Sequence, residues 1–275
     1  MTYREIDRSA FGTVPLRDQP APVLQWLTLA ELVIDERYQR PLCEINWAAI
    51  RRIAAAFDWS RFTPVVVAPV EGGRFAVIDG QHRVHAAALC GVERVPAMVA
   101  LIAPQAQAQA FIDINSKAIK VSGHHLYRAA LVAGEAWAIR ARNAVAAADC
   151  VLMEWNNVKA ADKRPGQVYC IGLVRRLVEA GHSGALTAGL RAIRAVDEGR
   201  KTELYTDMIL TPWLNALALH PAAQALDLAA FLRRHSPWLV IQSADKAAAG
   251  HRIPLTVARR DAFVARLMQF GKAAA

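Results

Sequence analysis

The chain of 275 residues is 54% hydrophobic and 21% charged, a composition that supports a sizeable core and excludes wholesale disorder. No apolar run reaches the roughly 18 residues that span a bilayer, and the N-terminus lacks the apolar core of a signal peptide, so we expect a cytoplasmic protein with no membrane partner. Residues 1–130 hold 14 Lys+Arg against 12 Asp+Glu (+2), and residues 131–275 hold 19 against 12 (+7), which favours a polyanionic partner such as DNA.

The N-terminal half alternates short strands and helices. Residues 1–22, with one glycine and three prolines, predict an irregular leader. Composition and periodicity then predict a strand or turn at 23–29, strands at 65–68, 74–78 and 95–101, and helices at 47–57, 82–89 and 105–114. Asn46 is the expected cap of the first helix and Gly91 ends the second. The turn at 71–73 joins two strands as a hairpin.

Beyond Gly123 the pattern becomes almost entirely helical. Apolar stripes predict helices at 125–133, 168–178, 186–196, 204–219, 222–232 and 257–270, with no fixed period that would indicate a solenoid. We therefore predict an α+β fold in three parts: a leader (1–22), a small mixed sheet with helices (23–130) and an α-helical bundle (131–275).

The four cysteines form no C-x-x-C pair, which argues against a zinc site and a disulfide framework. We expect Cys43, Cys90, Cys150 and Cys170 to be buried thiols.

The segment that carries chemistry is the strand–turn–helix at residues 75–87. A strand feeds directly into a helix through Gly80, so the first helical amides point outward with the positive end of the helix dipole. Gly80 lets an anion approach, Arg83 offers a fork to a phosphate oxygen, and His82 adds an imidazole donor. Asp79 would repel a phosphate, so we expect it to brace Arg83 or the turn, or to help hold a cation. The alternative is a capped helix with solvated polar residues.

This turn resembles the motifs of a known superfamily. The run Asp79-Gly80-Gln81-His82-Arg83 is similar to the signature that names the DGQHR-domain proteins. It also resembles the G-E-R-R-x-R-A phosphate motif of ParB. Gly80, Arg83 and Ala86 match, and Gln81, His82 and His85 depart from that motif.

Two further segments follow in the order that ParB N-terminal domains show. Tyr38-Gln39-Arg40 resembles a Q-x-R stretch, and residues 111–117 resemble the segment with E-N-x-x-R, where Asn115 matches the asparagine. Ile114 stands where ParB has the glutamate associated with its metal. The resemblance covers residues 24–128 and implies a ParB/sulfiredoxin-like fold.

The resemblance implies a phosphate- or nucleotide-binding site and a nucleoside triphosphate with Mg²⁺ as its ligand. Gln39 and Arg40 close this site, and Asn115 with Lys117 lines its far side. The complete set of binding candidates is Gln39, Arg40, Asp79, Gly80, Gln81, His82, Arg83, Asn115 and Lys117. The sulfiredoxin turn reads G-C-H-R with a nucleophilic cysteine, but here Gln81 takes that place, so sulfiredoxin activity is not expected.

Two other groups of residues invite a functional reading. The pair His124-His125 could hold a metal with Asp113, but adjacent helical residues point about 100° apart, so we expect a polar helix start capped by Ser122 and no metal site. A basic loop close to Trp155 could lie along DNA, through Lys159, Lys163 and Arg164. A solvated loop is the alternative there.

We predict a ParB-like nucleotide- or phosphate-binding protein that acts on or near DNA, in genome maintenance of a plasmid or phage. The first alternative is a metal-dependent NTPase, CTPase-like, or a nuclease that uses the same pocket. The second is a nucleotide-independent interaction protein. A homodimer is compatible with all three hypotheses.

Overall fold

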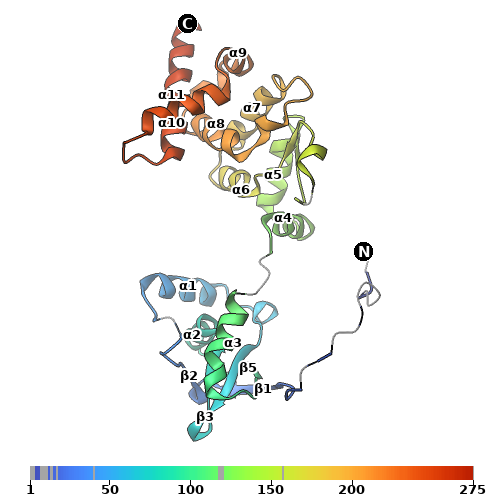
Figure 1. The fold of residues 1–275 in the computed structure, drawn as a ribbon, viewed down its shortest axis with the longest axis vertical. Helices are drawn as coiled ribbons and strands as arrows, with labels where there is room; N and C mark the ends of the chain where they lie inside the picture. Colours follow the sequence, from blue (N-terminus) through green and yellow to red (C-terminus); the bar gives the residue numbers. More distant parts are fainter. Residues whose placement is uncertain are drawn as a thin grey trace. The chain divides into compact units, whose positions relative to one another are not determined.

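The computed structural model describes residues 4–6, 12, 15–16, 18–39, 41–116, 121–156 and 158–274. The chain forms two compact units, residues 1–119 and 120–275 (Figure 1). Much of the predicted leader lies outside the described residues, and so do the site candidates Arg40 and Lys117. Among the described helices, none combines the length and the apolar character that a bilayer crossing requires.

The first unit is built on a five-stranded mixed sheet in the order β1-β5-β3-β4-β2. Its strands are β1 (Val23–Thr28), β2 (Leu32–Val33), β3 (Val65–Val70), β4 (Arg74–Asp79) and β5 (Arg94–Val99). β3 and β4 form the predicted antiparallel hairpin, in which Ala68 lies opposite Ala76. β3 runs parallel to β5, and β2 runs parallel to β4. The predicted mixed sheet is confirmed.

Three helices accompany this sheet: α1 (Glu44–Ala55), α2 (Gln81–Leu89) and α3 (Pro104–Ser116). α1 packs against α2, and α3 packs against β3 and β4. Val84 and Ala87 of α2 join the core formed by the β-branched residues of the strands. Burial of such side chains is the main stabilising contribution, at about 25 cal/mol per Å² of apolar surface.

The start of α1 differs from the prediction. The helix begins at Glu44, so Asn46 is its third residue and Cys43 is the residue before it. The Asn46 side chain reaches back and accepts a hydrogen bond from the Cys43 backbone amide at 3.3 Å, as the glutamate of a capping box does. Asn46 therefore stabilises the helix start from inside the first turn.

The second unit is a helical bundle, as predicted. Its helices are α4 (Gly123–Val132), α5 (Ala136–Ala146), α6 (Ile171–Glu179), α7 (Ser183–Arg194), α8 (Asp207–Leu219), α9 (Leu228–Arg234), α10 (Pro237–Ala248) and α11 (Leu255–Ala274). Its core centres on α7 and α8, where Leu190, Trp213 and Leu214 are fully buried. A two-stranded parallel sheet of β6 (Val151–Leu152) and β7 (Gln167–Val168) was not predicted.

Several predicted helix bounds in this unit were wrong. Val168 belongs to β7, so α6 starts only at Ile171. The single helix predicted at 222–232 is a short 3₁₀ turn (Pro221–Ala225) followed by α9, because Asp227 caps α9 by accepting from the Ala230 amide at 2.9 Å. The helix predicted at 204–219 begins at Asp207, after a 3₁₀ turn (Thr202–Tyr205).

The observed boundary between the two units changes the net charge assigned to each. The expected boundary after residue 130 falls inside α4, which packs against α5 and α6. Residues 1–119 hold 12 Lys+Arg against 12 Asp+Glu, and residues 120–275 hold 21 against 12. The whole net charge of +9 therefore resides in the helical unit.

Candidate phosphate-binding site

The turn between β4 and α2 requires glycine. Gly80 has φ +103°, in the left-handed region that other residues rarely adopt. A Cβ at this position would lie 2.7 Å from Cγ1 of Val65 and 2.8 Å from Nη2 of Arg83. Both the backbone conformation and the lack of space therefore exclude a larger residue, and the chain backbone stays accessible at the point where the helix begins.

The start of α2 presents backbone donors at this turn. The first intrahelical bond runs from the Val84 amide to the Gly80 carbonyl at 3.0 Å. The amides of His82 and Arg83 precede that bond and so have no acceptor within the helix. Gly80 has no side chain to cap them. Such amides, together with the helix dipole, favour an anion.

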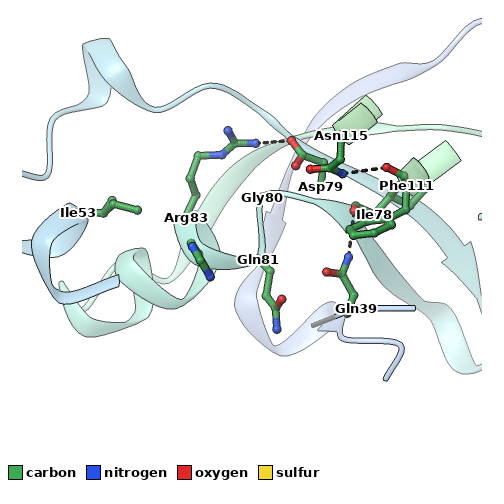
Figure 2. A pocket seen from close by; sticks show the side chains of 10 residues that line it. Gln39, Ile53, Ile78, Asp79, Gly80, Gln81, Arg83, Phe111 and Asn115 are labelled. Carbon is green, nitrogen blue, oxygen red and sulfur yellow. Dashed lines mark hydrogen bonds and ion pairs between the residues drawn. The ribbon is translucent and has the colours of Figure 1, made fainter. Parts of the chain in front are cut away.

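Arg83 folds back over the turn. Its Nη2 donates to Oδ2 of Asp79 at 3.0 Å, which is one of the roles that the sequence left open for Asp79 (Figure 2). Both side chains remain about 30% exposed, at 27% for Arg83 and 31% for Asp79. The Nε of Arg83 is buried and makes no hydrogen bond within the described part of the chain. The guanidinium is thus fixed by Asp79 while part of its donor capacity is unused.

Gln39 has a structural bond that the sequence did not reveal. Its side chain is buried, and its Nε2 donates to the carbonyls of Val77 at 2.8 Å and Ile78 at 2.9 Å. The ladder between β3 and β4 shifts register between Val66 and Val67, so these carbonyls lie at an irregular strand end. Gln39 therefore satisfies backbone groups there and ties its loop to the turn.

His82 is held from α1. The Nδ2 of Asn46 lies 3.2 Å from Nε2 of His82, and Oδ1 of Asn46 accepts from the thiol of Cys43 at 2.7 Å. With the amide nitrogen of Asn46 as the donor, Nε2 of His82 is the acceptor in this contact. Asn46 is a site residue that the sequence placed only as a helix cap.

The turn and its neighbours line one cavity of about 340 Å³, while Asn46 lies behind His82 and is not part of the wall. Its walls are formed by Gln39, Ile53, Ile78, Asp79, Gly80, Gln81, His82, Arg83, Phe111 and Asn115. The seven predicted binding residues that the structure describes are therefore all brought together. Ile53, Ile78 and Phe111 were missed, because apolar wall residues look like core in a sequence. Asn115 donates its Nδ2 to the Phe111 carbonyl at 2.8 Å (Figure 2).

The basic loop lies in the other unit. Lys159 and Arg164 are exposed, and the ammonium of Lys163 lies 4.5 Å from the ring centroid of Tyr169.

Ser122 caps α4 as predicted, accepting from the His125 amide at 3.3 Å. Among the described residues, no group of three or more His, Cys, Asp or Glu is arranged to hold a metal.

The cysteine prediction was right for two residues and wrong for two. Cys150 and Cys170 are buried, and burial raises the pKa of Cys170 to about 12. Cys43 and Cys90 are exposed because each flanks a helix end, Cys43 before α1 and Cys90 after α2.

With this geometry in view, the family comparison identifies the segment that holds the cavity. Residues 29–116 match the ParB N-terminal domain. The match includes every described residue that lines the cavity. It ends with α3 and so leaves the helical unit unassigned.

Two solved structures resemble the chain more loosely. The C-terminally truncated chromosome-partitioning protein ParB from Caulobacter crescentus, complexed with CTP-gamma-S, is 15% identical, with a TM-score of 0.37 over 77% of this chain and 98% of that chain. The same protein complexed to the centromeric parS site is 14% identical, with a TM-score of 0.30 over 86% of this chain and 98% of that chain. No curated protein matches the chain.

Proposed function

We propose that the ParB N-terminal domain of this chain binds the phosphate groups of a nucleoside triphosphate at the Gly80 turn, and that the protein acts in association with DNA. The observation that carries the proposal is the turn itself. A left-handed glycine precedes a helix start, and the guanidinium of Arg83 lies over that glycine with a buried, unpartnered Nε among the described residues. A phosphate oxygen is an acceptor of suitable charge for such a group.

The chemistry of the cavity suits phosphate better than a purely structural role for the turn. An unpartnered buried guanidinium N–H destabilises the protein by about 1–3 kcal/mol, so its retention beside free helical amides favours a ligand that completes the bonding. The first unit has no net charge. Anion binding in this unit would therefore depend on the hydrogen-bond donors of the turn, and not on long-range attraction by a net positive charge.

The residues of the cavity could hold Mg²⁺ only if the phosphates of a bound nucleotide supplied further ligands. Mg²⁺ in proteins keeps several waters and takes one or two carboxylates together with substrate phosphates. Asp79 is the carboxylate in the cavity, and it is already paired with Arg83. A magnesium ion bound with the nucleotide would neutralise phosphate charge, and Asp79 would be its protein ligand.

The finer identity of the protein belongs to the same proposal. We assign it to the DGQHR type because of the run from Asp79 to Arg83. A setting in genome maintenance of a plasmid or phage rests on that resemblance alone. The association with DNA is supported by the ParB N-terminal domain and by the charge of +9 on the second unit.

Calorimetric titration with CTP, ATP and GTP, with and without Mg²⁺, tests the nucleotide site. The wild type should bind at least one of them saturably, and Arg83→Ala should lower the affinity by about tenfold or more, because a charge-assisted hydrogen bond contributes about 1.5–3 kcal/mol. Arg74→Ala, which removes the same charge from the exposed start of β4, should bind as the wild type does. Absence of binding by a folded wild-type protein would contradict the proposal and favour an interaction protein without a nucleotide.

A phosphate-release assay on the same samples separates binding from turnover. Mg²⁺-dependent hydrolysis that disappears in Arg83→Ala would favour the NTPase alternative. Binding without turnover is the result expected from a binding module.

A further inference from the structure

The side chain of Asn46 links the start of α1 to the phosphate-binding cavity. α1 packs along α2, with Ile50 fully buried and the ring of Trp47 against the ring of His85 at 5.7 Å. This packing places Asn46, in the first turn of α1, beside His82, in the first turn of α2. The two side chains meet at 3.2 Å, between Nδ2 of Asn46 and Nε2 of His82.

The orientation of the Asn46 amide is fixed by Cys43. A backbone N–H only donates, so the atom of Asn46 that lies 3.3 Å from the Cys43 amide must be its oxygen. The Cys43 thiol donates to the same oxygen at 2.7 Å. The nitrogen of the Asn46 side chain is therefore the atom that faces His82, and an amide nitrogen donates but does not accept. Nε2 of His82 is left as the acceptor, a role that it fills only without a proton.

One ring nitrogen of His82 is then free for a ligand. In a neutral imidazole whose Nε2 is unprotonated, the proton is on Nδ1, and Nδ1 is a hydrogen-bond donor. His82 lines the cavity, where a phosphate oxygen is a suitable acceptor. The opposite tautomer would set an N–H of His82 against an N–H of Asn46 and would present a lone pair to the phosphate.

The second histidine of the motif, His85, is bonded differently. Its Nδ1 lies 2.8 Å from the Gln81 carbonyl, which only accepts, so the proton on Nδ1 of His85 is donated to the backbone of its own helix. The tautomer of His82 is instead set from α1. A substitution at Asn46 can therefore change the donor that His82 offers without touching α2.

The charges in the cavity give such a donor its importance. Asp79 and Arg83 contribute one negative and one positive charge to the wall, and they are paired at 3.0 Å. A phosphate therefore meets no excess of positive charge from these two side chains. Its binding would depend on directed hydrogen bonds, from the amides at the start of α2 and from Nδ1 of His82.

We propose that Asn46 is a positioning residue of the phosphate site, which holds His82 as the tautomer with its proton on Nδ1 and so makes the imidazole a donor to a phosphate oxygen. This inference rests on the proposed function, and it adds α1 to the elements that determine the affinity of the site. Asn46 acts through His82 and lies outside the cavity wall.

Nitrogen-15 NMR of the histidine side chains measures the tautomer on the intact chain without nucleotide. Protonated and unprotonated ring nitrogens have well-separated shifts, and the signals that are missing from His82→Phe belong to His82. At about pH 9, well above the ordinary histidine pKa of about 6.5, we expect the wild type to carry the proton on Nδ1. Asn46→Asp keeps an oxygen for the Cys43 amide but turns a second oxygen toward His82, so the proton should move to Nε2.

Calorimetry at the same pH, with the nucleotide that binds the wild type best, measures the consequence for affinity. Asn46→Asp should weaken binding about tenfold, because the phosphate then faces a lone pair of His82 and not a donor. Its melting temperature should stay at or above that of the wild type, since a carboxylate in the first turn stabilises a helix. The same substitution in His82→Phe should weaken binding by less than about threefold, because no tautomer is left to change.

The comparison of the two backgrounds separates positioning from simple repulsion by the added carboxylate. A matched control is Ala48→Glu, which adds the same charge on the exposed side of α1. It should bind the nucleotide within about twofold of the wild type, because solvent and salt screen a charge at the surface.

Two results would overturn the inference and leave the proposed nucleotide site in place. The first is a wild-type His82 that carries its proton on Nε2. The second is an equal loss of affinity on Asn46→Asp with and without His82. A folded wild type that binds no nucleotide would contradict both the proposed function and the donor role of His82.

Discussion

At the scale of single residues, Gly80 decides whether the turn before α2 can form. Its φ of +103° and the 2.7 Å approach of Val65 to a built Cβ act together. Gly91 offers a comparison, because its φ is +71° but a Cβ there meets nothing within 4 Å. A substitution at Gly91 therefore introduces backbone strain alone, whereas a substitution at Gly80 introduces both backbone strain and crowding.

We predict that Gly80→Ala lowers the free energy of unfolding by about 2–4 kcal/mol, while Gly91→Ala lowers it by about 1 kcal/mol. Gly80→Ala should also weaken nucleotide binding, since the new methyl group displaces the Arg83 guanidinium. Urea denaturation and calorimetry measure the two effects. Equal stability losses in the two variants would show that the crowding at Gly80 is relieved by small shifts.

The sequence was sufficient for the residues whose role is local. Gly80 and Arg83 are four positions or fewer from the helix start, so a single motif placed them, and it included the pairing of Asp79 with Arg83 among the possible roles of Asp79. Asn46 and Gln39 meet the turn from 36 or more positions away, Asn46 at His82 and Gln39 at Val77. No periodicity or spacing in one sequence encodes such contacts.

At the scale of elements, α7 and α8 pack closely around a glycine. A Cβ on Gly189 would lie 2.4 Å from Cδ2 of Leu214 and 2.9 Å from Cδ1 of Leu217, and both leucines are fully buried. The Trp213 indole also donates to the Gly189 carbonyl at 3.0 Å. The helix tolerates glycine here because the neighbouring helix occupies the space.

We predict that Gly189→Ala destabilises the protein by about 1–2 kcal/mol, although alanine is intrinsically the better helix former by about 1 kcal/mol. Gly172→Ala, which adds its methyl group to open space, should be neutral or stabilising. Thermal unfolding of both variants checks the difference in sign. A Gly189→Ala protein more stable than the wild type would mean that the two leucines repack without strain.

The segment after α7 is held by one buried carboxylate. Asp197 accepts from Tyr205 at 2.6 Å, from Arg194 at 2.7 Å and from the Gly199 amide at 2.7 Å. Burial alone would raise the pKa of Asp197, but these three hydrogen bonds outweigh it and hold the pKa below its ordinary value of 3.8. The ionised carboxylate therefore stabilises the folded state above the unfolded pKa, and this contribution is lost as the pH falls through the folded pKa.

We predict that Asp197→Asn lowers the free energy of unfolding by about 2–4 kcal/mol at pH 7, because it breaks a buried charged network. The deficit relative to the wild type should shrink as the pH falls below about 4, where the unfolded chain takes up the proton first, and on through the lower folded-state pKa of Asp197. Urea denaturation of both proteins at pH 7 and below about pH 4 measures this deficit. A deficit that does not change with pH would show that the ionised form has no special role.

The two helices that the sequence missed, α5 and α10, each have a physical reason for it. α5 buries mostly alanines, such as Ala138 and Ala141, whose small side chains give no strong apolar stripe. α10 begins at Pro237, and a proline signals a break in a sequence although it suits the first helical position. The strongly amphipathic helix α6 was predicted to within a few residues.

At the scale of the whole molecule, the two units divide the proposed tasks. The neutral unit carries the cavity at the Gly80 turn, and the unit of charge +9 carries the basic loop. The sequence predicted both parts of the fold and the basic surplus of the second. It placed the boundary inside α4, because the residues between α3 and α4 contain no proline and only the glycine that starts α4.

We predict that fragments 1–119 and 120–275 each unfold cooperatively, because each has its own core. The first fragment should retain nucleotide binding and the second should retain salt-dependent DNA binding. Circular dichroism with urea, followed by nucleotide calorimetry and a DNA-binding assay at several salt concentrations, examines this division. A fragment that is unfolded alone would contradict the independence of the units.

If phosphate is held at the start of α2, adding the nucleotide changes the chemical shifts of the backbone amides there. The ¹⁵N-labelled chain would be titrated with the nucleotide that calorimetry selects. We expect the largest shift changes at the amides from Gly80 to Arg83, and we expect Arg83→Ala to abolish them. Saturable binding that leaves these amides unchanged and shifts others would contradict a phosphate site at this turn.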